Sequence, residues 1–240
     1  MFAFTSTNID LSGAQMHNIQ NADYMFAFTG LAPYTRIFNI VNKRGNKAMG
    51  YFTYLNLPKV TNEDQLPFTF AQGSTTNYMF LMTLLGEPGT FDTEEHMTLT
   101  PQEESLDFLD TSNVVSMKGM FMLSSANYDL QKLNTTNVKS TMLMFAGYGL
   151  FGAVFAAAQD KIDLNYFPEI KFPATKTNTK FKLIGDCDTR YMFSFFIEFP
   201  GISDKKYGNF DLQGIDVGEL TNFKSMFAFG LGIFNFDLSK

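Results

Sequence analysis

Residues 129–145 read DLQKLNTTNVKSTMLMF, and residues 105–121 read SLDFLDTSNVVSMKGMF. The two segments carry Leu, Thr, Asn, Val, Ser and a closing Met-Phe pair at the same offsets. The Met-Phe pair recurs along the chain, ending at Phe2, Phe26, Phe80, Phe121, Phe145, Phe193 and Phe227. Such recurrence is typical of a chain built from repeated structural units, and it accounts for 28 Phe and 14 Met beside no Trp.

Two further residue types keep a fixed distance from the Met-Phe pair. An aspartate lies sixteen residues before the phenylalanine in three copies, at Asp10, Asp129 and Asp211. An asparagine lies eight residues before it at Asn18, Asn113 and Asn137. These coincidences favour a degenerate internal repeat over chance.

Two hydrophobic periods alternate within each copy. Ile9-Asp10-Leu11 and similar triplets alternate apolar and polar residues, which predicts a half-buried strand with its aspartate outward. Val114, Met117, Met120 and Phe121 fall at i, i+3, i+6 and i+7, which predicts one face of a short helix. Residues 111–113, Thr-Ser-Asn, match a helix N-cap.

The predicted fold class is therefore an α/β repeat: a leucine-rich-like solenoid of strand, turn and short helix units with a parallel sheet on one face. We expect one domain over residues 1–240, with about eight degenerate repeats and insertions near residues 90–104, 168–182 and 198–208. The expected structural anchors are Phe26, Phe121, Phe145, Phe227, Asn113 and Asn137.

The first four residues, MFAF, return at residues 25–28 and 226–229. A chain that opens in register with its own repeat is expected to be a segment of a longer protein. Further repeats or neighbouring subunits are then the expected partners of the solenoid ends, because terminal units without polar caps expose their apolar face.

Composition excludes several classes of partner. A net charge of −6 without a basic run argues against nucleic acid and against an anionic membrane surface. The longest apolar stretch, residues 143–158, contains several glycines and is shorter than the ~18 residues of a membrane span, so no membrane insertion is expected. Cys187 is the single cysteine and has no partner for an internal disulfide.

The segments 105–121 and 129–145 resemble the repeat of a bacterial surface-protein family, the BspA-like and mycoplasma-lipoprotein type of leucine-rich-like repeat. That repeat reads D-L-S-x-W-D-T-S-N-V-x-x-M-x-x-M-F. Leu109 and Leu133 stand where the family usually has Trp. The resemblance implies an extracellular or cell-surface bacterial protein that binds host, matrix or cellular molecules, without enzymatic activity and without catalytic residues.

The outward aspartates form the candidate binding row on the sheet face. Its members are Asp10, Asp129, Asp163, Asp211 and Asp237. Like charges on adjacent strands repel, so these carboxylates are staggered, hydrogen-bonded to neighbours, or bridged by cations. Calcium requires six or more oxygen ligands, which single aspartates on a flat sheet rarely supply, so a structural or solvated row is favoured and no metal is expected.

A second acidic group lies in the first insertion and includes Asp92, Glu94, Glu95 and His96. Such residues bind zinc or act as acid and base in some proteins. Their setting among Thr, Pro and Gly favours a solvated loop. The chain lacks GxSxG and glycine-rich phosphate motifs and has two histidines, so we expect no enzyme and no cofactor.

The sequence thus predicts a non-enzymatic, adhesin-like interaction module that binds a protein or glycan partner. One alternative is a structural segment of a larger surface filament, sheath or machine. A weaker alternative is a hydrolase built on the insertions. Concentration-dependent self-association would favour the structural reading.

Overall fold

The computed structural model describes residues 1–4, 9–29, 55–60, 66–83, 86–87, 91–93, 96–97, 100–101, 103–124, 126–149, 170–195, 209–229 and 233–235. Within these ranges the regular elements are short β-strands joined by turns. The strands are β1 (Ile9–Asp10), β2 (Met16–Asn21), β3 (Leu55–Asn56), β4 (Phe68–Thr75), β5 (Gly86–Glu87), β6 (Phe91–Thr93), β7 (His96–Met97), β8 (Thr100–Pro101), β9 (Glu103–Ser105), β10 (Leu109–Asp110), β11 (Val114–Ser116), β12 (Asn127–Asp129), β13 (Ile170–Lys171), β14 (Asn209–Asp211) and β15 (Ile233–Asn235).

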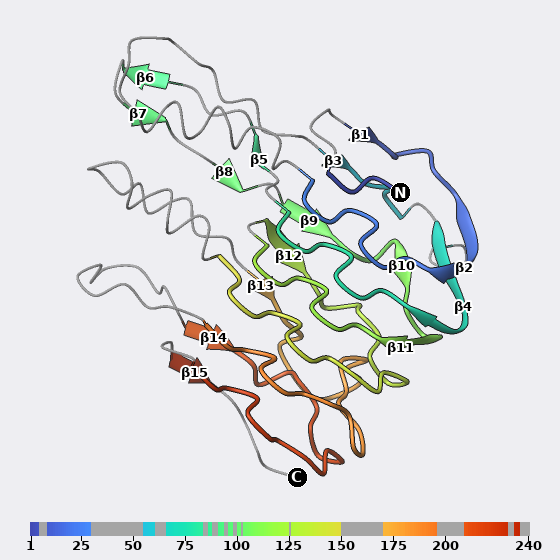
Figure 1. Ribbon diagram of the computed structural model, residues 1–240, viewed down its shortest axis with the longest axis vertical. Coiled ribbons are helices and arrows are strands. Elements are labelled where there is room, and N and C mark those ends of the chain that lie inside the picture. Colours follow the sequence, from blue (N-terminus) through green and yellow to red (C-terminus); the bar gives the residue numbers. More distant parts are fainter. Residues whose placement is uncertain are drawn as a thin grey trace.

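Most strand pairs are parallel and join segments far apart in the sequence. β4 pairs with β2, β10 and β11, and β12 lies between β9 and β13. β1 pairs with β3, and β14 pairs with β15, also in parallel. The pairs β5–β8 and β6–β7 are antiparallel. Figure 1 shows successive parts of the chain side by side, in colour order from blue to red.

The Met-Phe segments form tight turns that hydrogen-bond to one another. The N–H of Phe26 donates to the Met79 carbonyl at 2.9 Å, and the N–H of Phe80 donates to the Met120 carbonyl at 2.8 Å. The intervening N–H groups bond within their own turn, as Met25 N–H does to the Ala22 carbonyl. We call these segments the Met-Phe turns: residues 1–4, 22–29, 76–83, 117–124, 141–148, 189–195 and 223–229.

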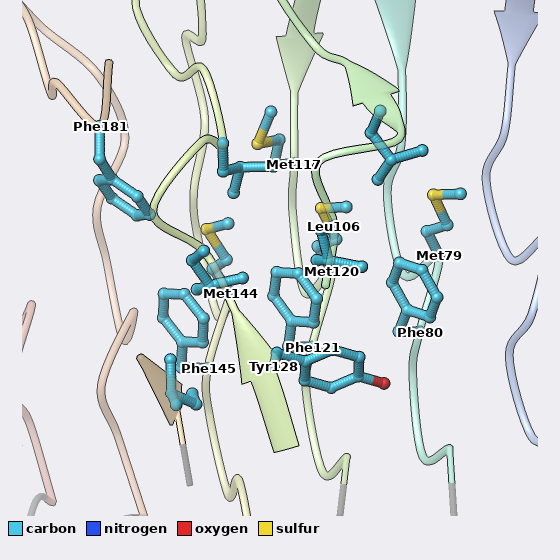
Figure 2. Close-up of a cluster of buried hydrophobic side chains, with 14 of the residues drawn as sticks. Met79, Phe80, Leu106, Met117, Met120, Phe121, Tyr128, Met144, Phe145 and Phe181 are labelled. Atoms are coloured by element: carbon cyan, nitrogen blue, oxygen red, sulfur yellow. The ribbon is translucent and has the colours of Figure 1, made fainter. Parts of the chain in front are cut away.

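The phenylalanines of the seven Met-Phe turns lie on one another. Consecutive rings are 5.3 to 5.6 Å apart between centroids and within 17° of parallel. Figure 2 shows Phe80, Phe121 and Phe145 in one row, with Met79, Met120 and Met144 in a second row beside them. Both rows are buried, and they form the centre of the hydrophobic core.

The prediction of an α/β leucine-rich-like solenoid with short helices is wrong. The described residues contain no helix, and their strands form several small sheets rather than one continuous parallel sheet. The residue two after every motif phenylalanine, and the residue two before each one from Phe26 on, has φ between 50° and 63°. Left-handed residues recurring four apart are incompatible with an α-helix, which needs right-handed φ throughout and i to i−4 hydrogen bonds.

The expected helix face at residues 114–121 is instead part strand and part turn. Val114 lies in β11, whereas Met117, Met120 and Phe121 lie in a Met-Phe turn. Turns closed by i to i−3 bonds also place residues three apart on the same side, so the hydrophobic period resembles that of a helix. No helix of the described chain is long and apolar enough to span a membrane.

The expected insertions are described in part. The first contains the antiparallel pair β6–β7, and the second contains β13, which pairs with β12. Residues 198–208 lie outside the described residues.

Candidate interaction surface

The predicted aspartate row is distributed over different sheets. Asp10 ends β1, Asp129 ends β12 and Asp211 ends β14, and their register partners are Asn56, Lys171 with Ser105, and Asn235, respectively. The structure therefore does not bring these three residues together on one sheet. Asp163 and Asp237 lie outside the described residues.

Asp10 and Asp129 each begin a turn. Asp10 Oδ1 accepts hydrogen bonds from the N–H of Ser12 and from Asn56 Nδ2, both at 3.0 Å. Asp129 Oδ1 accepts from the N–H of Gln131 at 3.0 Å. The hydrogen bonds from Ser12 lower the pKa of Asp10. An aspartate that accepts from the N–H two residues on is a typical turn-forming residue.

The same hydrogen bond recurs where the chain bends elsewhere. Asp110, Asn134, Asp188, Asp216 and Asn222 each accept from the N–H two residues later. The recurring Asp and Asn positions therefore satisfy backbone donors at turns.

The predicted anchors lie in or beside the core. Phe26, Phe121 and Phe145 are fully buried, whereas Phe227 is only partly buried. Asn113 Nδ2 donates to the Phe70 carbonyl at 3.0 Å, and Asn137 Nδ2 donates to the Ser112 carbonyl at 2.7 Å. Each asparagine thus connects its segment to a neighbouring one through a backbone carbonyl.

The other candidate groups do not assemble into a site in the described structure. Asp92 and His96 lie in β6 and β7, and Glu94 and Glu95 are outside the described residues. Among the residues that the structure describes, no group of three His, Cys, Asp or Glu side chains is placed to hold a metal. Cys187 is buried, and that burial raises the pKa of its thiol.

A surface that sequence reasoning missed lies two residues before the motif phenylalanines. We call Tyr24, Tyr78 and Tyr191, together with their polar neighbours Asp23, Asn77 and Arg190, the tyrosine strip. Tyr24 and Tyr78 stack with ring centroids 5.1 Å apart at 17°. Tyr24 is 46% exposed and Tyr191 is 36% exposed.

The local backbone holds these tyrosines outward. All three have φ between 55° and 58°, in the left-handed region that bulky residues rarely adopt. The N–H of Tyr24 donates to the Asn77 carbonyl, and the N–H of Tyr78 donates to the Lys118 carbonyl. Adjacent turns therefore keep Tyr24 and Tyr78 in register. Tyr191 holds the equivalent position three turns further along, beyond Gly119 and Leu143.

Gly119 makes room for the Tyr78 ring. It occupies the equivalent position in the next turn with φ +57°, and a Cβ there would lie 2.3 Å from Tyr78 Cε1. Burial raises the pKa of the Tyr78 hydroxyl, and the nearby Tyr24 raises it further. The Tyr78 hydroxyl therefore stays protonated at neutral pH.

Hydrogen-bonded polar groups flank the rings at one end. Asp23 Oδ1 accepts from the Asn77 N–H at 2.7 Å, and Asp23 Oδ2 accepts from Asn77 Nδ2 at 3.2 Å. Asn77 Oδ1 in turn accepts from Ser116 Oγ at 2.6 Å and from the Lys118 N–H at 3.0 Å. These bonds extend the polar edge across three adjacent turns.

A bidentate ion pair flanks Tyr191. Arg190 donates from Nε and Nη2 to the two carboxylate oxygens of Asp188, at 2.9 and 2.8 Å. The hydrogen bond from Arg190 lowers the pKa of Asp188. The pair fixes the guanidinium plane of Arg190, the residue directly before Tyr191, and favours the charged forms of both side chains.

The sequence did carry a signal for this strip. Tyr precedes the Met-Phe pair directly in three copies, at residues 24, 78 and 191. If the segment were a helix, the residue before the Met-Phe pair would be an ordinary surface position. The helix prediction therefore did not mark these tyrosines as exposed.

Comparison with known proteins gives one family match. Residues 93–157 match the model of a family described as Mycoplasma protein of unknown function, DUF285. This range includes residues 105–145, so the resemblance to a mycoplasma-type family is confirmed there at that level. No curated protein and no solved structure matches the chain.

Proposed function

We propose that this chain is a non-enzymatic interaction module of a cell-surface or secreted bacterial protein, and that it binds a protein or glycan partner. The main support for the proposal is the tyrosine strip. Its aromatic rings are exposed, although the turns that carry them can form without an aromatic side chain at that position. The resemblance of residues 105–145 to repeats of bacterial surface proteins supports the location.

The turn geometry itself favours a different residue at these positions. A left-handed residue other than glycine costs about 1 to 2 kcal/mol, and Gly119 occupies the equivalent position. Tyr24 and Tyr191 adopt this unfavourable conformation and also expose apolar ring surface. Strained residues that persist on a surface are a motive for a functional hypothesis.

The chemistry of the strip suits a hydrated partner. Tyrosine offers an apolar ring with a polar tip, and Tyr and Arg are the residues most often found to dominate binding at interfaces. Asp23, Asn77 and Arg190 add a carboxylate, an amide and a guanidinium whose positions are fixed by hydrogen bonds. Sugar hydroxyls and polar peptide groups both complement such a set.

The test is a binding screen with matched variants. The purified chain is applied to a glycan array and to an array of purified extracellular-matrix proteins. We expect a specific ligand in one of the two. Tyr24→Ala and Tyr191→Ala should each weaken its affinity by about tenfold or more, in the range of an interface hot spot.

Exposed residues away from the strip supply the control. Glu219→Ala should leave the affinity unchanged, because Glu219 is exposed and lies outside the strip. Circular dichroism verifies that each variant is folded. A ligand whose affinity is indifferent to both tyrosine substitutions, or the absence of any ligand on either array, would refute the proposal.

The surface location has its own measurement. An antibody against the chain should label intact cells of the source bacterium, and added protease should remove that signal. Labelling that appears only after the cells are lysed would contradict the location.

A further inference from the structure

The polar edge of the tyrosine strip changes charge along the stack of turns. The position three residues before each motif phenylalanine from Phe26 on is occupied, in order, by Asp23, Asn77, Lys118, Met142, Arg190 and Lys224. Backbone bonds connect neighbours in this order, since the N–H of Leu143 donates to the Arg190 carbonyl at 3.0 Å. The edge therefore begins with a carboxylate and ends with cations.

The cations at this end gather around Asp188. The hydrogen bonds from Arg190 lower the pKa of Asp188, and the positive charge of Lys118 lowers it further. Lys118 and Arg190 belong to turns that are not adjacent, so their common effect on Asp188 shows that both charges face the same part of the surface.

Two more lysines extend the positive charge. The N–H of Asp188 donates to the Lys139 carbonyl at 2.9 Å, and Lys139 is exposed. Lys224 is exposed and holds the position of Arg190 in the next turn. Against these four cations stand Asp186 and Asp188, which leaves an excess of two positive charges. We call this region the cationic end of the tyrosine strip.

Arg190 keeps donors for a ligand. Its side chain is 50% exposed. The bonds to Asp188 come from Nε and Nη2, and a guanidinium carries more N–H donors than these two bonds use. Asp188 therefore holds the guanidinium in one orientation and leaves further donors for a second carboxylate, the group that arginine binds best.

Tyr191 offers a ring face beside this guanidinium. Tyr24 and Tyr78 stack on each other, and Gly119 lies against Tyr78. In the described part of the chain no ring stacks on Tyr191, which is 36% exposed. Its N–H donates to the carbonyl of Ser225, whose side chain is too short to cover a tyrosine ring. The C–H face of a sugar ring packs on such an aromatic surface while its polar groups reach the edge.

We propose that the cationic end of the tyrosine strip binds an acidic sugar, a sialic or uronic acid residue of a larger saccharide. The sugar ring packs on Tyr191, and its carboxylate accepts hydrogen bonds from Arg190. Lys118 and Lys224 add attraction at longer range. This inference rests on the proposed function and narrows its ligand from a protein or glycan to an acidic saccharide.

The limited positive charge favours a saccharide with few carboxylates. The chain as a whole has a net charge of −6, so a dense polyanion would be repelled beyond the cationic end. Towards Tyr24 the edge carries Asn77 and Asp23, which complement sugar hydroxyls and would repel the successive carboxylates of an acidic peptide. Four steps of ~4.8 Å separate Tyr191 from Tyr24, about 19 Å in all, so a saccharide of several residues reaches both rings.

Titration calorimetry with matched saccharides tests the role of the carboxylate. One pair is sialyllactose and lactose. The other is a hyaluronan oligosaccharide and the same compound with its carboxyl groups reduced to alcohols. We expect the acidic member of one pair to bind at least about tenfold more tightly than its neutral partner, and the pair that shows this preference distinguishes sialic from uronic acid. Added salt should reduce the preference, because the charges are exposed.

Variants assign the preference to the named residues. Arg190→Ala should remove most of the preference for the acidic member, whereas Tyr191→Ala should weaken the binding of both members. Lys180→Ala is the matched control, since it removes the same charge from an exposed residue outside the strip, and it should leave both affinities unchanged. Circular dichroism verifies that each variant is folded.

Several outcomes would overturn the inference. They are equal affinities within both pairs, no binding of either acidic saccharide, and a preference that Arg190→Ala leaves intact. Binding of a glutamate-rich peptide that depends on Arg190, in a chain that binds neither acidic saccharide, would overturn it as well. A neutral glycan or a protein ligand that depends on Tyr24 and Tyr191 would support the proposed function while it refutes the acidic saccharide, so the two failures are distinguishable.

Discussion

Removal of one ring from the buried phenylalanine stack should destabilise the chain strongly. Phe145 is fully buried. Its ring stacks on Phe121 at 5.5 Å and on Phe193 at 5.4 Å, and it meets Phe172 edge-on at 5.4 Å. Phe145→Ala therefore loses the transfer free energy of the ring, leaves a cavity and removes three aromatic contacts.

The magnitude follows from those three terms. Truncation of a buried phenylalanine to alanine costs about 3 to 5 kcal/mol, and each ring contact adds about 0.5 to 1.5 kcal/mol beyond its buried area. Because the turns on both sides are tied by backbone hydrogen bonds, collapse around the cavity is restricted. We expect a loss near the upper end, about 5 kcal/mol, in the free energy of unfolding.

Urea unfolding followed by circular dichroism measures this loss. The midpoint should fall while the slope with urea stays the same, since the surface exposed on unfolding hardly changes. Phe229→Ala is the matched control: the same substitution at a ring that is 68% exposed, with an expected cost of about 1 kcal/mol or less. Equal losses for the two variants, or a loss below about 1 kcal/mol for Phe145→Ala, would refute the stacked core.

Three further outcomes are expected. Gly119→Ala should lower the free energy of unfolding by about 2 to 4 kcal/mol, because the new Cβ would collide with Tyr78. Gly185→Ala is the control: with φ +62° and open space around it, it should cost about 1 to 2 kcal/mol. Thermal melts compare the two variants, and adding Tyr78→Ala should restore stability to Gly119→Ala. The bonds from Arg190 lower the pKa of Asp188 in the folded chain. The ion pair therefore stabilises the fold above the ordinary aspartate pKa of about 3.9, and this stabilisation is lost as pH falls below it. Asp188→Asn should make the melting temperature depend less on pH in that acidic range, and an unchanged profile would count against the pair. Cys187 is buried with a raised thiol pKa, so a thiol reagent at about pH 8 should label it only as fast as the chain unfolds; immediate labelling of the folded chain would show that the burial is wrong.

Sequence periodicity identified buried positions better than it identified secondary structure. Met117, Met120 and Phe121 follow a spacing of three and four, and all three are buried. The same spacing arises on one side of an α-helix and on the inner side of consecutive turns with i to i−3 bonds. The helix prediction failed because residue spacing does not indicate φ. Left-handed residues exclude the helix, and they include Tyr24, Leu123 and Phe229, which are residue types that rarely adopt positive φ.

The candidate surface was harder to predict than the core for a related reason. The apolar-Asp-apolar alternation, repeated at a fixed distance from the Met-Phe pair, predicts an outward row that includes Asp10 and Asp129. Their carboxylates instead accept hydrogen bonds from their own turns. The regularly spaced aspartates are therefore residues that stabilise turns by accepting backbone hydrogen bonds. The exposed tyrosines could be located only once the direction of each turn was known.

The equivalent turn positions also separate stability from recognition. Gly119 and Gly147 show that the backbone forms its turn, and its hydrogen bonds to the next turn, without a side chain at the left-handed positions. The interior positions have no such freedom, because each Met and Phe fills space between two neighbouring turns. Truncation of an exposed side chain such as Tyr24 therefore changes what the surface binds at little cost in stability. We therefore expect Tyr24→Ala to weaken ligand binding while it leaves the free energy of unfolding nearly unchanged.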